Sequence, residues 1–379
     1  IPTVMHNELH KLNQVLNYVK QAFVSRDEAI DLLGIALVAQ ENAFLMGPPG
    51  TAKSAIVRRL SDCIENGKNF EYLLTRFTEP NELFGPFDIR KLREGELLTN
   101  TEGMLPEASM VFLDELFNAN SAILNSLLLA LNERIFRRGK ETRKLPTLLF
   151  VGASNQLPDD ESLAALLDRF LIRMRLDYVE PDLLEQVLIA GWNAASDNES
   201  NRPRIQPSEI MRLQAACKEI DLSGIRILYI DLIRQLRNAG AKVSDRRAVK
   251  IQNLLAASAL ISGRTHAIPS DCWVMKYIWD TEEQVELLRG MIDPVIESDT
   301  STQAHPQSGL NQKPEPENLM QDLLELETQL RKDSSPANRT RIKDKLRYFQ
   351  SRIDWIESEA SKAQLNQKAE ALWTELLRD

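Results

Sequence analysis

The chain of 379 residues has little cysteine, little histidine and no long apolar run. Its three cysteines lie far apart, which argues against both a disulfide framework and a zinc site and favours a reducing cytoplasm. The four histidines show no metal-ligand spacing. No stretch approaches the roughly 18 apolar residues that cross a bilayer, so we expect no transmembrane segment. Residues 1–10 also lack the basic start and apolar stretch of a signal peptide.

The overall balance of residues is that of a folded protein with an acidic surface. Hydrophobic residues make up 43% of the chain, charged residues 27%, and the formal net charge is -9. This length favours two or three folded units. The negative total disfavours a general nucleic-acid binder, although a basic strip inside a ring or groove is compatible with it.

A run of small residues after a short apolar segment (43–46) has the layout of a phosphate-binding loop. The run consists of Gly47, Pro48, Pro49, Gly50, Thr51, Ala52, Lys53 and Ser54. Glycines let backbone N–H groups face an anion at a helix N-terminus, Lys53 would reach the outer phosphates, and the Ser54 hydroxyl would bind Mg²⁺. Ala52 replaces the usual glycine, and we expect it to be tolerated with helical dihedral angles. The alternative is an ordinary Gly/Pro turn between a strand and a helix.

Two carboxylates follow the next strongly apolar run, 110–113. Asp114 and Glu115 would stand at the carboxyl end of a buried strand, where α/β sheets bind ligands. Asp114 would then hold Mg²⁺ and Glu115 would act as general base on the attacking water. A solvated acidic turn is the alternative, but a phosphate loop earlier in the chain favours the catalytic interpretation.

Asn155 ends a third apolar run, 148–151 with its small-residue extension. Its amide could hydrogen-bond the attacking water or the γ-phosphate, which is a sensor role. A turn asparagine before Pro158 is the alternative.

Short apolar strands alternate with helical patterns through the first half of the chain, which predicts a parallel sheet covered on both faces. Ser25, with Glu28 three residues later, predicts an N-cap and capping box for a helix that ends at Ala39. A helix is predicted over 121–133. A hairpin is predicted over 88–101.

The pattern predicts four segments. They are a nucleotide-binding core (1–177), an all-helical domain (178–290), a linker or disordered loop (291–318) and a helical hairpin or arm (319–379). The arm is predicted from leucines that recur at spacings of four, three and four residues, at 319, 323, 326 and 330. Two core helices docked on the preceding domain are the alternative for that segment.

Together these motifs resemble the AAA+ ATPases of the MoxR group, over roughly residues 8–285. The resemblance rests on the phosphate loop, on the strands that end in Asp114-Glu115 and Asn155, and on the segment 165–170. Within that group the chain is most similar to the RavA subfamily, through segments 23–30, 72–77, 84–86 and 244–247. An alanine before the loop lysine is usual in this group.

The resemblance implies ATP and Mg²⁺ as cofactors and several further site residues. Arg169 matches the arginine finger that acts on the nucleotide of a neighbouring subunit. Arg246 matches the sensor-2 position on the helical lid, with Arg247 as a close competitor. Phe23 matches the segment that covers the adenine base, where an ordinary core aromatic is the alternative.

The resemblance also implies a cytoplasmic homo-oligomer, expected to be a hexamer. It would remodel a client protein complex together with a von Willebrand factor A (vWA) domain partner. The predicted hairpin over 88–101 and the segment 134–144, around Gly139, resemble hairpin insertions that would face the pore of a ring. Three rival interpretations stay open: a DNA-directed motor, supported by the basic hairpin over 134–144 and opposed by the net charge; an ATP-gated scaffold with negligible turnover; and, more remotely, metal insertion into a tetrapyrrole.

Overall fold

The computed structural model describes residues 3–179, 181–195, 202–301, 303–308, 316–332, 335–353 and 359–377. The chain divides into two compact units. Unit 1 comprises Ile1–Asp221 and Asp245–His266, and unit 2 comprises Leu222–Ser244 and Ala267–Asp379. Among the helices in the described ranges, none is long and apolar enough to cross a membrane.

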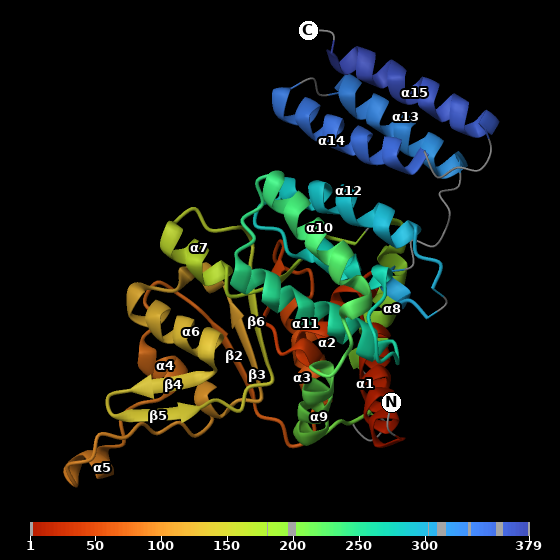
Figure 1. Ribbon diagram of the computed structural model, residues 1–379. Coiled ribbons are helices and arrows are strands. Elements are labelled where there is room, and N and C mark those ends of the chain that lie inside the picture. The colour runs from red at the N-terminus through yellow and green to blue at the C-terminus, as the bar shows by residue number, and fades with distance from the viewer. Residues whose placement is uncertain are drawn as a thin grey trace. The chain divides into compact units, whose positions relative to one another are not determined.

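Unit 1 is built around a five-stranded parallel sheet, with helices on both sides of it (Figure 1). The strand order is β2-β3-β6-β1-β7. The strands are β1 (Ala43–Met46), β2 (Asn69–Leu73), β3 (Met110–Asp114), β6 (Leu149–Ser154) and β7 (Ile172–Arg175). All four residues of β1 and all six of β6 are buried, as expected of central strands covered on two faces. The predicted α/β class is therefore confirmed.

Most of the long helices of unit 1 pack against this sheet or against one another, whereas the short α5 (Ile89–Arg93) buries none of its residues. The helices of this unit are α1 (Thr3–Lys20), α2 (Asp27–Ala39), α3 (Lys53–Asp62), α4 (Pro80–Phe84), α5 (Ile89–Arg93), α6 (Ser121–Glu133), α7 (Glu161–Leu167), α8 (Leu184–Ala195), α9 (Pro207–Cys217) and α11 (Asp245–Ile261), with short 3₁₀ turns η1 (Leu105–Glu107), η2 (Leu116–Asn118) and η3 (Pro181–Leu183). The helix predicted over 121–133 has those bounds, with the Asn120 side chain as its N-cap.

Two local predictions for unit 1 are wrong. Helix α2 begins at Asp27 with Arg26 as N-cap, and Ser25 has a left-handed backbone (φ 56°), so the predicted capping box does not form. The buried Arg26 side chain, which donates a hydrogen bond to the Asp177 carbonyl, shows that a tertiary contact governs this turn.

The segment 88–101 is not a strand hairpin. The chain folds back through one antiparallel bridge, Phe87 to Thr99, but the first part of the segment is the helix α5. The Asp88 carboxylate caps that helix by accepting from the N–H groups of Arg90 and Lys91. The second hairpin is present as β4 (Ile135–Arg138) and β5 (Glu141–Lys144), paired antiparallel across Gly139.

Unit 2 is helical throughout its described residues. Its elements are η5 (Ser223–Ile225), α10 (Arg226–Asn238), η6 (Pro269–Tyr277), α12 (Glu283–Glu297), η7 (Pro306–Ser308), α13 (Pro316–Lys332), α14 (Pro336–Ile353) and α15 (Glu359–Leu377). The last three helices form a bundle in which α14 also packs against α12.

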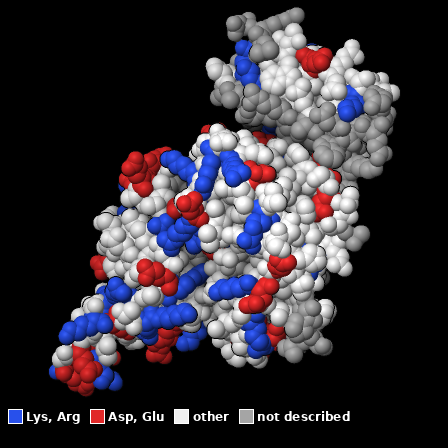
Figure 2. Space-filling model, in the orientation of Figure 1, with Lys and Arg blue, Asp and Glu red and all other residues white. Residues whose placement is uncertain are grey.

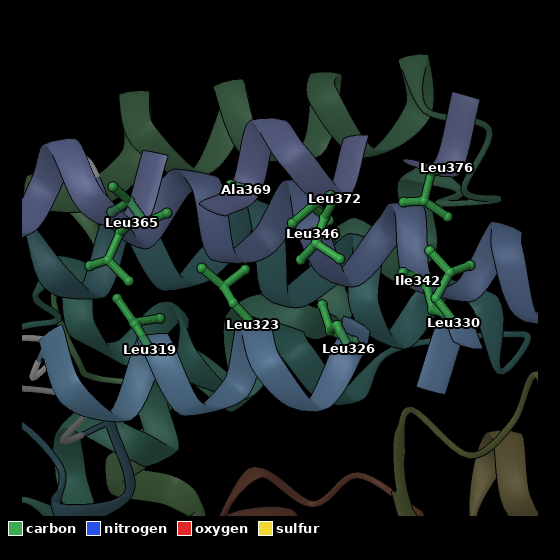
Figure 3. Close-up of a cluster of buried hydrophobic side chains, with 11 residues drawn as sticks. Leu319, Leu323, Leu326, Leu330, Ile342, Leu346, Leu365, Ala369, Leu372 and Leu376 are labelled. Atoms are coloured by element: carbon green, nitrogen blue, oxygen red, sulfur yellow. The ribbon is translucent and has the colours of Figure 1, made fainter. Parts of the chain in front are cut away.

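The core of this bundle is drawn from all three helices (Figure 3). Its buried residues are Leu319, Leu323, Leu326, Leu330, Ile342, Leu346, Ile353, Leu365, Ala369, Leu372 and Leu376. The predicted two-helix hairpin is thus a three-helix bundle, because α15 supplies a third apolar stripe with spacings of four, three and four residues.

The predicted boundaries at 177, 290 and 318 do not coincide with the edges of the compact units, and they stay predictions about functional modules. Part of the predicted linker is ordered and packed. Helix α12 continues to Glu297, and the buried His305 ring stacks on Trp273 at 4.9 Å between ring centroids. Residues 302 and 309–315 of that segment lie outside the described residues.

Candidate nucleotide site

The carboxyl ends of three neighbouring strands bring the predicted site residues together. In the order β3-β6-β1, Asp114 ends the first strand, Asn155 follows the second and Gly47 follows the third. The register aligns these ends, because Met46 pairs with Ser154, and Leu113 with Gly152. The phosphate-loop residues, the two carboxylates and the sensor asparagine therefore share one edge of the sheet.

Gly47 occupies a position that only glycine fits. Its N–H donates to the Ser154 carbonyl at 3.1 Å, and a Cβ added to it would lie 2.0 Å from the Leu176 carbonyl oxygen. The start of the loop is thus held between the ends of β6 and β7. Any side chain here would push the loop away from the sheet.

The loop itself presents unsatisfied donors. In the described part of the chain, the N–H groups of Gly50, Thr51 and Ala52 make no backbone hydrogen bond, while the Thr51 hydroxyl donates to the Pro48 carbonyl at 2.9 Å. Backbone N–H groups at a helix N-terminus, here that of α3, fit an anionic phosphate. The loop therefore fits the triphosphate of a nucleotide.

Lys53 is buried at the start of α3, and its ammonium lies against its own loop. Its Nζ donates to the carbonyls of Gly47 at 2.6 Å and Pro48 at 2.9 Å. Burial lowers the pKa of Lys53, and the negative charges of Asp114 and Glu115 oppose that shift. The side chain is thus already within the field of both carboxylates, where it would meet a phosphate.

Ala52 does not have the helical dihedral angles that we expected. It is the N-cap of α3 with φ 69° and ψ 19°, in the left-handed region that favours glycine. For a residue with a Cβ, this conformation costs about 1–2 kcal/mol. The alanine is therefore tolerated at the cost of backbone strain.

Replacing Ala52 with glycine is expected to raise the free energy of unfolding by about 0.5–1 kcal/mol, because the strain removed outweighs the added entropy of the unfolded chain. Urea unfolding of the whole protein, followed by circular dichroism, would measure the shift in the midpoint of unfolding. Ala55→Gly, inside α3, is the matched control and should lower the midpoint. A lower midpoint for Ala52→Gly as well would contradict the strain assignment.

The acidic pair and the asparagine make one hydrogen-bonded group. Asn155 Nδ2 donates to Glu115 Oε1 at 3.0 Å, and the Glu115 N–H donates to Asp114 Oδ1 at 2.9 Å. Glu115 has φ 51°, a left-handed backbone that turns the chain sharply after β3. Within the described segments, no three His, Cys, Asp or Glu side chains gather to hold a metal, so a cation here would need the nucleotide and water as further ligands.

Arg169 lies just beyond α7, with its guanidinium beside a neighbouring carboxylate. Its Nη1 contacts the neighbouring Asp168 carboxylate at 2.7 Å, while its Nε is buried and has no partner among the described residues. Its side chain is 27% exposed. These features are compatible with a finger that reaches another subunit, and they leave that role a prediction.

The two candidate lid arginines differ in exposure. Arg246, in the first turn of α11, is exposed, whereas Arg247 is buried. An exposed guanidinium is free to reach a ligand, which favours Arg246 over Arg247. Phe23 lies in the turn between α1 and α2, half-buried. The roles of Arg246 and Phe23 stay predictions.

Comparison with known proteins decides the family. Residues 10–215 match the model of the MoxR domain in the MoxR-vWA-beta-propeller ternary systems, and residues 225–292 match that of the AAA lid domain. The chain belongs to the MoxR family of AAA+ ATPases.

Several relatives of this MoxR protein are known. An uncharacterised protein of Methanocaldococcus jannaschii is 33% identical over 294 residues, which cover 76% of this chain and 75% of that protein. The chaperone MoxR1 of Mycobacterium tuberculosis is 22% identical over 70% of this chain and 73% of its own length. A solved structure of a putative ATPase from Cytophaga hutchinsonii has a TM-score of 0.61 at 17% identity, over 78% of this chain and 96% of that chain, which shows a shared fold.

The basic β4–β5 hairpin of this MoxR protein uses several of its cationic side chains internally. Arg138 donates to the Gly85 carbonyl and lies 4.0 Å from the Phe87 ring centroid, and Arg143 contacts Thr101. Figure 2 shows Lys and Arg side chains over the region of β4, β5 and α5, with acidic residues at its tip. Two of the hairpin's arginines therefore bind within the protein, while Arg137, Lys140 and Lys144 are exposed.

Sequence reasoning missed one half-buried residue at the root of this hairpin, whose guanidinium packs against a ring inside the protein. Arg134, the C-cap of α6, has its guanidinium 4.6 Å from the Phe150 ring centroid, and burial lowers its pKa to about 10. The sequence prediction for 134–144 treats it only as one of several basic residues. The only available signal was its position directly after an apolar helix and before a strand.

Proposed function

We propose that the chain is a Mg²⁺-dependent ATP hydrolase that works as a homo-oligomeric ring, with a hexamer as the expected size, and remodels protein complexes as a chaperone does. The observation that carries the proposal is the shared sheet edge at which the phosphate loop meets Glu115, with Asn155 only 3.0 Å from its carboxylate. The family membership supports the nucleotide and the ATPase chemistry.

The residues at this edge divide the chemistry among them. Loop N–H groups and Lys53 would bind the phosphates, and Ser54 and Asp114 would hold Mg²⁺, which neutralises phosphate charge when bound. Glu115 would accept the proton of the attacking water, while Asn155 keeps the carboxylate in place. Arg169 would complete the site of a neighbouring subunit, and Arg246 would reach the phosphates from α11.

The partners are proposed from the matched family. The family model is named for ternary systems of MoxR, vWA and β-propeller proteins, which supports a vWA-domain partner for this chain. The narrower placement in the RavA subfamily rests on sequence segments alone. The cytoplasmic location is supported by three buried, free cysteines.

Turnover measurements test the proposal. We expect ATP hydrolysis that needs Mg²⁺, that stops with a chelator and that duplex DNA does not stimulate, because Arg138 and Arg143 are engaged within the protein. Salt-sensitive stimulation by DNA would favour the DNA-directed motor instead. ATP-dependent assembly in sedimentation without measurable turnover would favour the scaffold and contradict the proposed hydrolase.

A further inference from the structure

Asn42, the residue before β1, holds the backbone of the Arg169 segment from inside the protein. Its side chain is 2% exposed, and its Nδ2 donates to the carbonyl of Arg169 at 2.8 Å and to that of Leu131 at 3.3 Å. Its own carbonyl accepts from the N–H groups of Leu171 and Ile172. The chain beside Arg169 is therefore held by both the side chain and the main chain of one residue.

Arg134 fixes the orientation of that amide. Its Nη2 donates to Asn42 Oδ1 at 2.8 Å, so the Nδ2 end of the Asn42 amide must face the carbonyls of Arg169 and Leu131. A cationic donor on one end and two carbonyls on the other leave a single satisfied arrangement. Because Arg134 also begins the β4–β5 hairpin, the same amide joins the hairpin root to the Arg169 segment.

Arg173 holds the same segment from β7. It is 1% exposed, its Nε donates to the Phe170 carbonyl at 3.0 Å, and its Nη2 donates to the Leu167 carbonyl at 3.2 Å. Phe170 and Leu167 flank Arg169. A buried guanidinium that spans two carbonyls fixes a turn more rigidly than the single ammonium of a lysine can.

We propose that Asn42 and Arg173 are positioning residues that place the Arg169 guanidinium for catalysis on a neighbouring subunit; this inference rests on the proposed finger role of Arg169. Neither residue would touch the nucleotide. A finger is effective only at the correct place, and a displacement of about 1 Å can cost about a hundredfold in rate. The buried hydrogen bonds of Asn42 and Arg173 to the backbone around Arg169 would supply that precision.

Asn42→Asp tests the inference, because it keeps an acceptor for Arg134 and removes both donors to the carbonyls. We expect kcat to fall about tenfold to a hundredfold while the affinity of the variant for a fluorescent ATP analogue changes less than about twofold. Mixing Asn42→Asp with Lys53→Ala should restore activity, since the Lys53→Ala subunits have an intact finger. Mixing it with Arg169→Ala should not, because both would lack a working finger.

Controls separate this role from a general loss of structure. Asn69→Asp makes the same change at an exposed position of β2 and should leave kcat unaltered. Arg173→Lys is a second variant with the same expected pattern if Asn42→Asp does not fold. Wild-type kcat in both variants, weakened ATP binding, or rescue by Arg169→Ala would overturn the inference. Full activity of Arg169→Ala itself would instead remove the proposed finger role.

Discussion

Replacing Glu115 with glutamine is expected to leave ATP bound and to lower turnover by about 10²- to 10⁴-fold, the usual contribution of a general base. The glutamine side chain keeps an oxygen that can accept the 3.0 Å hydrogen bond from Asn155, so the geometry of the edge should survive. The variant loses only the basic carboxylate. Single-turnover and steady-state hydrolysis, together with binding of a fluorescent ATP analogue, would measure both effects.

The control for this prediction is another glutamate in the same unit. Glu133, exposed at the end of α6, changed to glutamine should leave turnover and binding as in the wild type. If Glu115→Gln hydrolyses ATP at the wild-type rate, Glu115 is not the general base and the proposed mechanism is wrong. The same variant, if it traps ATP, is also the reagent of choice for identifying client proteins.

Arg169→Ala and Lys53→Ala are each expected to abolish hydrolysis, by different routes. Lys53→Ala removes the buried ammonium at the phosphate loop and should lose nucleotide binding. Arg169→Ala should bind ATP and fail to hydrolyse it, with a loss of about 10³-fold or more if the guanidinium acts as a finger. Because the finger would serve the neighbouring subunit, the two defects should complement each other.

Mixed rings make this complementation measurable. At equal amounts and random assembly, roughly a quarter of the interfaces would combine an intact Lys53 with an intact Arg169, so hydrolysis should return toward that fraction. Arg234→Ala, at an exposed position of α10, is the control for loss of a surface arginine. Failure of every mixing ratio to restore hydrolysis would count against an intersubunit site.

The sequence predicted the edge of the sheet well, because apolar strands that end in polar residues carry a strong local signal. The phosphate loop, Asp114-Glu115 and Asn155 fall on three adjacent strands as that signal implies. It could not predict the left-handed Ala52, since the backbone there is set by the fit of the loop beside β6 and β7. Nor could it distinguish Arg134 from its more exposed neighbours, because the packing of its guanidinium depends on Phe150 and Asn42, which are distant in sequence.

The wrong fold predictions have comparable causes. The segment 88–101 has turn residues and polar alternation, but the Asp88 cap stabilises a helical turn that the pattern did not show. Ser25 matched a capping box, and the buried Arg26 took the cap position instead. The third helix of the bundle could have been predicted, since Leu365, Leu372 and Leu376 repeat the spacing of the first.

The left-handed backbones of Ala52 and Glu115 have a consequence for laboratory evolution. Both residues lie at the nucleotide edge in a conformation that costs about 1–2 kcal/mol for a residue with a Cβ, so glycine at either position would relieve strain. Of the two, only Glu115 has a side chain with a proposed catalytic role. Selection for heat resistance without selection for turnover should therefore enrich glycine at both positions. We expect all such variants to have a higher melting temperature, and those with glycine at position 115 to have lost ATP hydrolysis as well.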